Sequence, residues 1–96
     1  MDSIVIYRSV NRDGATFALK PSSRELLQAR LGDAVHIRSR IFIAHETQAD
    51  YNSVHGNLAP QIVQLLTGLS VERLREFGDL EFRDPVTEAA IPLSAA

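Results

Sequence analysis

Three histidines and two nearby carboxylates are the residues of this 96-residue chain whose types could bind a metal ion. They are His36, His45 and His55, with Glu46 and Asp50 between them. Metal ligands on one helix lie about one turn apart, and these histidines are much farther apart in the sequence. The spacing therefore predicts no metal site, and histidines that flank a strand and a loop are the simpler interpretation.

The other patterns that support catalysis are missing from the sequence. No serine lies in a Gly-x-Ser-x-Gly turn, and the glycines are scattered rather than gathered in a phosphate-binding loop. Glu72 and Glu76 are one helical turn apart, but Arg73 and Arg75 lie among them, as on a solvated helix surface. No cysteine is present, which excludes thiolate chemistry and disulfides. We therefore expect a protein that is not an enzyme and has no cofactor.

One basic pattern could contact nucleic acid. His36, Arg38 and Arg40 alternate within residues 34–45, where no Asp or Glu occurs, and alternate residues of a strand face the same side. Cations at that spacing can follow a phosphate backbone. However, Phe42 is the aromatic residue available for stacking, and the formal net charge of the chain is −2. Nucleic acid is therefore the less favoured partner.

Strands are predicted in the first half of the chain. Residues 3–10 are rich in β-branched and aromatic side chains, and residues 11–14 (NRDG) tolerate a tight turn. Apolar side chains then alternate with others from Ala15 to Leu19, which predicts a β-hairpin over residues 3–20. Residues 34–45 fit both a strand and a helix, and their Val and Ile content favours a third strand.

A first helix is predicted directly after the hairpin. Ser22 and Glu25 have capping-box spacing, in which each side chain accepts a hydrogen bond from the other residue's backbone N–H. Leu27 and its apolar neighbours would face inward. Gly32 can adopt the left-handed conformation that ends a helix, so the helix is only two to three turns long.

A pair of helices is predicted after a polar loop at residues 46–56. The first helix begins near Pro60 and ends at Gly68, and Ser70 then caps a second helix over residues 71–77. The first helix carries an apolar stripe at helical spacing, made of Leu58, Ile62, Leu65, Leu66 and Leu69. The two helices would meet at a tight corner, as in a helical hairpin.

The sequence as a whole predicts a small α+β fold: a β-hairpin and a third strand packed on short helices, with a C-terminal helical pair. We expect one globular domain over residues 1–83, with a brief strand at Leu80–Phe82, and an extended tail over residues 84–96. The apolar runs are far shorter than the roughly 20 residues that span a bilayer, and no signal-peptide pattern is present. We therefore expect a soluble protein without a membrane partner.

Two stretches resemble the small tail assembly chaperones of long-tailed bacteriophages. Leu19-Lys20-Pro21-Ser22, followed by Glu25-Leu26-Leu27, is similar to the turn into the first helix of that family. Leu65-Leu66-Thr67-Gly68-Leu69-Ser70-Val71-Glu72-Arg73-Leu74 resembles its C-terminal helical corner. The order of hairpin, short helix, linker and helical corner is also similar. Together these stretches cover about half of the chain.

The resemblance implies a non-catalytic protein that binds the tape measure protein, and in addition tail tube subunits, in the cytoplasm of a bacterial host. A tape measure protein is a long helical chain with apolar stripes, which a small partner with an apolar helical groove can cover. The groove candidates are Ile62, Leu65, Leu66, Leu69, Leu74 and Phe77. Each of them could instead belong to the domain's own core. Self-association into a homo-oligomer is left open.

Two other classes of function fit the same sequence. The first is a phage or plasmid accessory protein that binds a host factor, as an inhibitor or an immunity-type protein does. Small size, near-neutral charge and the missing catalytic motifs suit this class. The second is a small nucleic-acid-binding regulator that uses Arg38 and Arg40, and it would retain DNA in a salt-sensitive manner.

Overall fold

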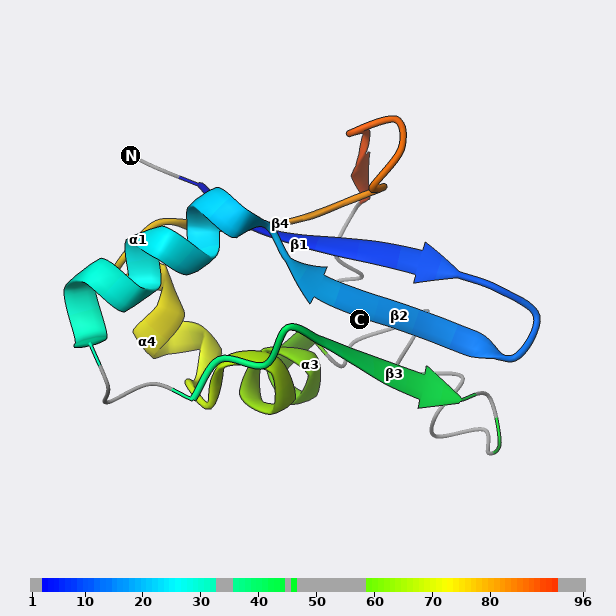
Figure 1. Ribbon diagram of the computed structural model, residues 1–96, viewed down its shortest axis with the longest axis horizontal. Helices are drawn as coiled ribbons and strands as arrows, with labels where there is room; N and C mark the ends of the chain where they lie inside the picture. The colour runs from blue at the N-terminus through cyan, green and yellow to red at the C-terminus, as the bar shows by residue number, and fades with distance from the viewer. Residues whose placement is uncertain (1–2, 33–35, 45, 47–58, 92–96) are drawn as a thin grey trace.

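The computed structural model describes residues 3–32, 36–44, 46 and 59–91, which form a five-stranded mixed β-sheet and three short helices (Figure 1). The strands are β1 (Ser3–Val10), β2 (Gly14–Leu19), β3 (Arg40–Ala44), β4 (Asp79–Arg83) and β5 (Ala90–Ile91). The helices are α1 (Pro21–Leu31), α3 (Ala59–Thr67) and α4 (Val71–Arg75). The strand order is β3-β2-β1-β4-β5. The predicted α+β fold is confirmed.

The predicted hairpin forms as β1 and β2. The two strands are antiparallel, with Ile6 opposite Leu19 and Val10 opposite Ala15. Asn11 closes the turn, because its side-chain oxygen accepts hydrogen bonds from the backbone N–H groups of Asp13 (2.9 Å) and Gly14 (3.0 Å). This is the local bonding that makes Asn a frequent turn residue.

The third strand is also confirmed, but it is shorter than predicted. β3 begins at Arg40 and pairs antiparallel with β2, with Ile43 opposite Ala15. The helical alternative for this segment is wrong. Residues 36–39 precede the strand in an irregular conformation, where the Arg38 N–H donates a hydrogen bond to the Leu66 carbonyl (2.9 Å). The predicted inward Val35 lies outside the described residues.

The segment predicted as a brief strand is β4, which lies inside the sheet rather than at its edge. β4 runs parallel to β1, with Ile4 opposite Leu80 and Ile6 opposite Phe82. A parallel pair requires a crossover connection, and here the chain between the two strands supplies β2, β3 and all three helices. The long connection explains why neither strand's own sequence indicates the pairing.

Part of the predicted extended tail belongs to the sheet. The Asp84 carboxylate accepts hydrogen bonds from the backbone N–H groups of Val86 (2.8 Å) and Thr87 (2.9 Å), which forms a turn. The Thr87 and Val86 bonds hold the pKa of Asp84 below its ordinary value. β5 then pairs antiparallel with β4. Residues 92–96 of the predicted tail lie outside the described residues.

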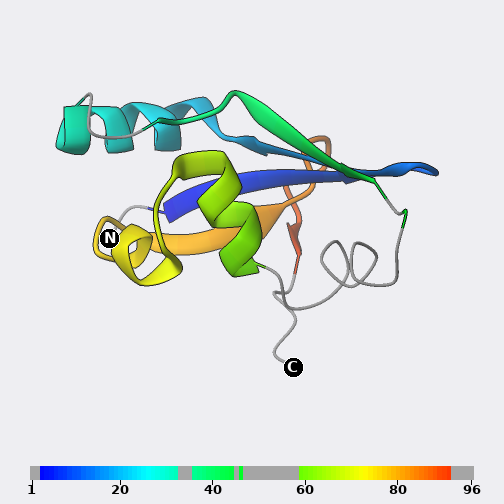
Figure 2. The ribbon, with the colours of Figure 1, turned by 90° about the horizontal axis from the view of Figure 1, so that it is seen from below.

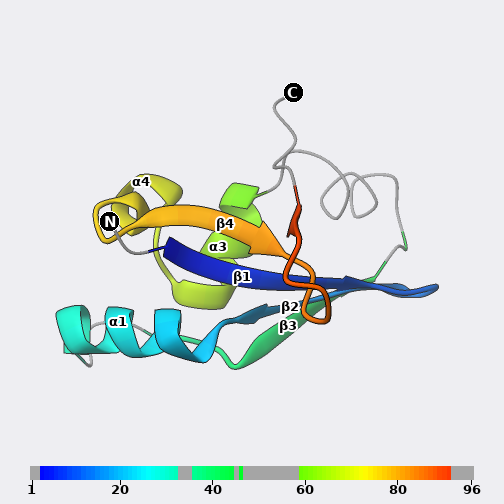
Figure 3. The same ribbon diagram turned by 90° about the horizontal axis from the view of Figure 1, so that it is seen from above.

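The hydrophobic core lies between the sheet and the helices. Figures 2 and 3 show α3 and α4 against one face of the sheet, while α1 continues beyond the end of β2. The core side chains are Ile4, Ile6, Ala15, Phe17, Leu19, Leu27, Ile43, Ile62, Val63, Leu66, Val71, Leu74 and Phe82. None of the described helices is long and apolar enough to cross a bilayer.

The corner between α3 and α4 forms as predicted, although α4 is shorter. Gly68 has a φ of 74°, which L side chains rarely adopt, so a glycine fits this helix stop. The Ser70 hydroxyl accepts a hydrogen bond from the Arg73 N–H (3.1 Å), as expected for an N-cap. α4 ends at Arg75, and a turn carries the chain on to Phe77.

The predicted capping box at the start of α1 is wrong. The helix begins two residues earlier, with Lys20 at the N-cap position and Pro21 as its first residue, and no side chain caps it. Instead, the next serine in the sequence has a structural role. Ser23 is buried, and its hydroxyl accepts a hydrogen bond from the Val5 N–H (2.9 Å) and donates one to the Ser3 carbonyl (3.3 Å). The Ser23 hydroxyl therefore bonds to the first residues of β1, which precede the part of β1 that pairs with β2.

Replacing Ser23 by Ala is expected to lower the free energy of unfolding by about 1 to 2 kcal/mol, because it leaves the Val5 N–H buried without an acceptor. The matched control is Ser22→Ala at the neighbouring exposed position, where we expect a change within about 0.5 kcal/mol. Urea unfolding followed by circular dichroism measures both. The reverse order of effects would indicate that Ser22 caps the helix after all.

Candidate functional site

Part of one face of the sheet is not covered by the described helices. Successive residues of a strand point to opposite sides of a sheet. Ile4 and Ile6 are buried, so they and the residues paired with them on the neighbouring strands face the core. The residues between them point to the other side, where α1 and the turn at residues 84–89 lie along its borders (Figures 1 and 3). We call the uncovered part the open face; it consists of Tyr7, Ser9, Thr16, Ala18, Arg40 and Phe42.

On the open face, β2 presents the small side chains of Thr16 and Ala18 between the side chains of β1 and β3; we call these three rows of side chains the trough, with β2 as its floor. On β2, Thr16 lies between Ser9 of β1 and Phe42 of β3 in the strand register. Ala18 lies between Tyr7 and Arg40 in the same way. Because β1 and β3 flank β2, the two sides of the trough are roughly 10 Å apart. An aromatic residue therefore stands on each side of this floor: Phe42, which is exposed, and Tyr7, which is half-buried.

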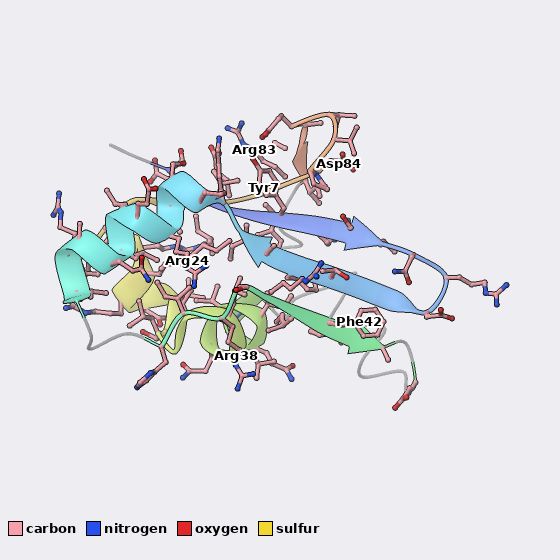
Figure 4. All side chains as sticks on the ribbon, in the orientation of Figure 1. Tyr7, Arg24, Arg38, Phe42, Arg83 and Asp84 are labelled. Atoms are coloured by element: carbon pink, nitrogen blue, oxygen red, sulfur yellow. The ribbon has the colours of Figure 1, made fainter. Side chains whose placement is uncertain are left out.

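Phe42 is the most prominent side chain of this face. It is 53% exposed, although it lies in the middle of a strand (Figure 4). Its ring passes over Gly14, the first residue of β2, so that a Cβ atom on Gly14 would lie 2.8 Å from the ring. This contact fixes the ring near the turn end of the trough while leaving half of its surface open to a ligand.

A cavity of about 410 Å³ opens where β1 meets the start of α1. Its lining combines two cationic side chains, Lys20 and Arg83, with two hydroxyls and two apolar residues; the other four are Ser3, Val5, Ser22 and Leu26. Among the described residues no carboxylate forms an ion pair with Lys20. Lys20 therefore offers its ammonium group to a small anionic group, whereas the Arg83 guanidinium is bonded to Glu81.

Acidic side chains gather on the β4 side of the sheet, where they are paired. The Arg83 guanidinium donates two hydrogen bonds to Glu81 (3.0 and 2.7 Å) and lies 3.9 Å from Glu88. The Tyr7 hydroxyl donates a hydrogen bond to Glu88 (2.6 Å). That bond is the main cause that raises the pKa of Tyr7 above its ordinary value. It is therefore intact at neutral pH and is lost only as the pH rises through the raised pKa.

The structure separates the three residues predicted to contact nucleic acid. His36, Arg38 and Arg40 are all exposed, but only Arg40 lies in β3 and on the open face. Arg38 lies beside α3, to which its backbone is hydrogen-bonded (Figure 4). Their common face was predicted from a longer strand than the one that forms.

The six residues predicted to bind a protein partner divide into two groups. Ile62, Leu66 and Leu74 are at most 1% exposed and belong to the core, so they offer no surface in this fold. Leu69 and Phe77 are half-buried against the core. Leu65 is 45% exposed and points away from the core side of α3. The predicted groove is therefore reduced to a small surface around Leu65.

The histidines do not form a described site. His36 is exposed, whereas His45 and His55 lie outside the described residues. Within residues 3–32, 36–44, 46 and 59–91, no three His, Asp or Glu side chains gather in a way that could hold a metal ion.

Sequence reasoning missed Tyr7, Lys20 and Arg83 as members of one surface. Alternation along residues 3–10 separates Tyr7 from Ile4 and Ile6, so the strand pattern could have placed Tyr7 on the solvent side. No comparable signal exists for Arg83, because its position beside Tyr7 depends on the parallel pairing of β4 with β1.

Comparison of the chain with protein-family models, with curated proteins and with solved structures finds no match. The resemblance to tail assembly chaperones thus stays a prediction from the sequence.

Proposed function

We propose that this chain is a non-catalytic, protein-binding domain that acts as a tail assembly chaperone in the cytoplasm of a bacterial host. Its partner would be the tape measure protein, with tail tube subunits as further partners. The observation that carries the proposal is the exposure of Leu65 on a helix whose other large apolar side chains are packed. The resemblance of the corner that follows it supports the same function.

The chemistry of α3 suits a helical partner. Its inner side is held by Ile62, Val63 and Leu66, so contact with a partner would not require the helix to leave the sheet. Its outer side presents Leu65, and the half-buried Leu69 follows after the helix stop at Gly68. An exposed apolar side chain on a helix can meet the apolar stripe of an amphipathic partner helix. A small contact of this kind would be reversible, as a chaperone requires.

Replacing Leu65 by Glu is expected to weaken binding of the tape measure protein at least about tenfold, because it places a charge in an apolar contact. Gln64→Glu is the matched control, since it adds the same charge at the adjacent exposed position. The measurement is the soluble fraction of the tape measure protein of the same genome when it is co-expressed with each variant.

The wild type and Gln64→Glu should keep the tape measure protein in solution, and Leu65→Glu should not. Two results would contradict the proposal. One is a tape measure protein that is equally soluble with and without the chain. The other is an equal effect of the two variants, which would show that the outer side of α3 is not the contact.

A further inference from the structure

The open face combines features that a single strand of nucleic acid requires, and they lie on a different surface from Leu65. We propose that this face binds single-stranded nucleic acid, with bases stacked on Phe42 and Tyr7 and backbone phosphates at Arg40 and in the cavity beside Lys20. This activity is independent of the chaperone function proposed above.

The first argument is the placement of the aromatic rings. Single-strand-binding surfaces offer aromatic side chains on which successive bases stack, whatever their sequence. Phe42 is 53% exposed, and Tyr7 stands across the trough with its hydroxyl fixed by Glu88. The floor between them consists of Thr16 and Ala18, which are small enough to let a base lie against either ring. A large residue on β2 would block that approach.

The second argument is charge complementarity. β1, β2 and β3 contain no Asp or Glu, and the open face carries Arg40 at one side of the trough. Lys20 directly follows β2, at the end of the same floor. The acidic residues of the sheet surface lie on the β4 side, where Glu81 is bonded to Arg83 and Glu88 accepts a hydrogen bond from the Tyr7 hydroxyl. A polyanion can therefore follow β2 without meeting a carboxylate on these three strands, although the whole chain has a net charge of −2.

The third argument is the cavity at the end of that path. Its volume of about 410 Å³ accommodates a phosphate group, and its polar lining includes the side chains of Lys20, Arg83 and Ser22. Lys20 is half-buried and has no carboxylate partner among the described residues, so its ammonium group is available to a phosphate oxygen. Phosphate contacts of this kind fix the position of a strand, while stacking holds its bases.

A protein partner fits this face less well than a nucleic acid. Protein interfaces are depleted of Lys, Ser and Ala and are enriched in aromatic residues, Met and Arg. The two rings and Arg40 would suit either kind of partner, whereas Lys20, Ser9 and Ala18 are of the types that protein interfaces contain least. The same arrangement matches the alternating bases and phosphates of a single strand.

The test measures fluorescence anisotropy of labelled oligo(dT) and oligo(U), each about 12 nucleotides long, with the full chain at about 50 and 200 mM salt. We expect the wild type to bind one or both oligonucleotides in a salt-sensitive manner, and the preferred sugar identifies DNA or RNA as the ligand. Phe42→Ala should weaken binding roughly tenfold through lost stacking. Arg40→Gln and Lys20→Gln should each lower the slope of log K against log salt by about 0.7.

Arg75→Gln is the matched control, because it removes an exposed cation from α4, on the other side of the sheet. It should leave both the affinity and the salt slope close to those of the wild type. Leu65→Glu should likewise retain binding, which keeps this test separate from that of the chaperone function. Circular dichroism of each variant verifies that it is folded.

Any of four results would overturn the proposal. The wild type could leave both oligonucleotides free at about 50 mM salt. Arg75→Gln could weaken binding as much as Arg40→Gln does, which would indicate general charge attraction. Folded Phe42→Ala could bind as tightly as the wild type, which would place the nucleic acid elsewhere. Co-purification of a protein that Phe42→Ala and Arg40→Gln both release, without oligonucleotide binding, would assign the open face to a protein instead.

Discussion

Replacing Phe17 by Ala is expected to lower the free energy of unfolding by about 3 to 5 kcal/mol. Phe17 is fully buried in β2, and its ring lies 5.9 Å from that of Phe82 in β4, at an interplanar angle of 53°. The substitution removes a large apolar side chain and leaves a cavity between strands that are far apart in sequence. Because domains of this size have a total stability of about 5 to 15 kcal/mol, the loss is a large fraction of it.

Phe42→Ala is the matched control for Phe17→Ala, since it makes the same chemical change on the neighbouring strand. Phe42 is 53% exposed, so we expect a loss of only about 1 kcal/mol. Urea unfolding monitored by circular dichroism compares the two variants. Equal losses would contradict the assignment of one ring to the core and the other to the surface. A small loss for Phe42→Ala also allows its effect on oligonucleotide binding to be measured in a folded protein.

Gly14→Ala is expected to lower the free energy of unfolding by about 3 kcal/mol, the upper part of the usual range for overpacking. Gly14 is buried where β2 passes close to β3. A Cβ atom there would overlap the Ile43 carbonyl oxygen and lie 2.8 Å from both the Ala44 Cα and the Phe42 ring. Backbone atoms cannot rotate away as a side chain can, so the strands would have to separate.

The double substitution Gly14→Ala with Phe42→Ala identifies which contact matters. It removes the ring but retains the Ile43 carbonyl, so we expect the double variant to remain destabilised relative to Phe42→Ala alone. Thermal and urea unfolding provide the comparison. Ala in place of Gly at an unobstructed position usually stabilises a protein through the unfolded chain. A stability equal to or above that of the wild type would therefore falsify the close approach of β3.

Gly14 also connects the fold with the proposed nucleic-acid site. Its missing side chain lets the Phe42 ring settle over the start of β2 instead of projecting freely. A ring held in this manner loses less conformational entropy when a base stacks on it than a mobile ring would. Stability of the strand pairing and exposure of the ring are thus two consequences of one small residue.

The elements whose signals are local could be predicted from the sequence. Alternating apolar residues predicted the hairpin, and Asn11 forms the turn that its side chain can bond. Gly68 and Ser70 predicted where one helix ends and the next begins, because a positive φ and an N-cap depend on neighbouring residues alone. At the start of α1, the spacing of Ser22 and Glu25 predicted a capping box that does not form. The buried Ser23 hydroxyl bonds to β1 instead.

Which apolar residues are covered, and which polar residues lie side by side, depends on how the whole chain packs. The stripe of α3 predicted Leu65 and Leu66 equally, and packing on the sheet buries one and leaves the other 45% exposed. The parallel pairing of β4 with β1 sets Arg83 opposite Tyr7, although the two residues are far apart in the sequence. Spacing along a chain reports contacts within an element, whereas a sheet face is assembled from strands whose order depends on the burial of the whole core. The open face follows from that order, and no single segment of the sequence specifies it.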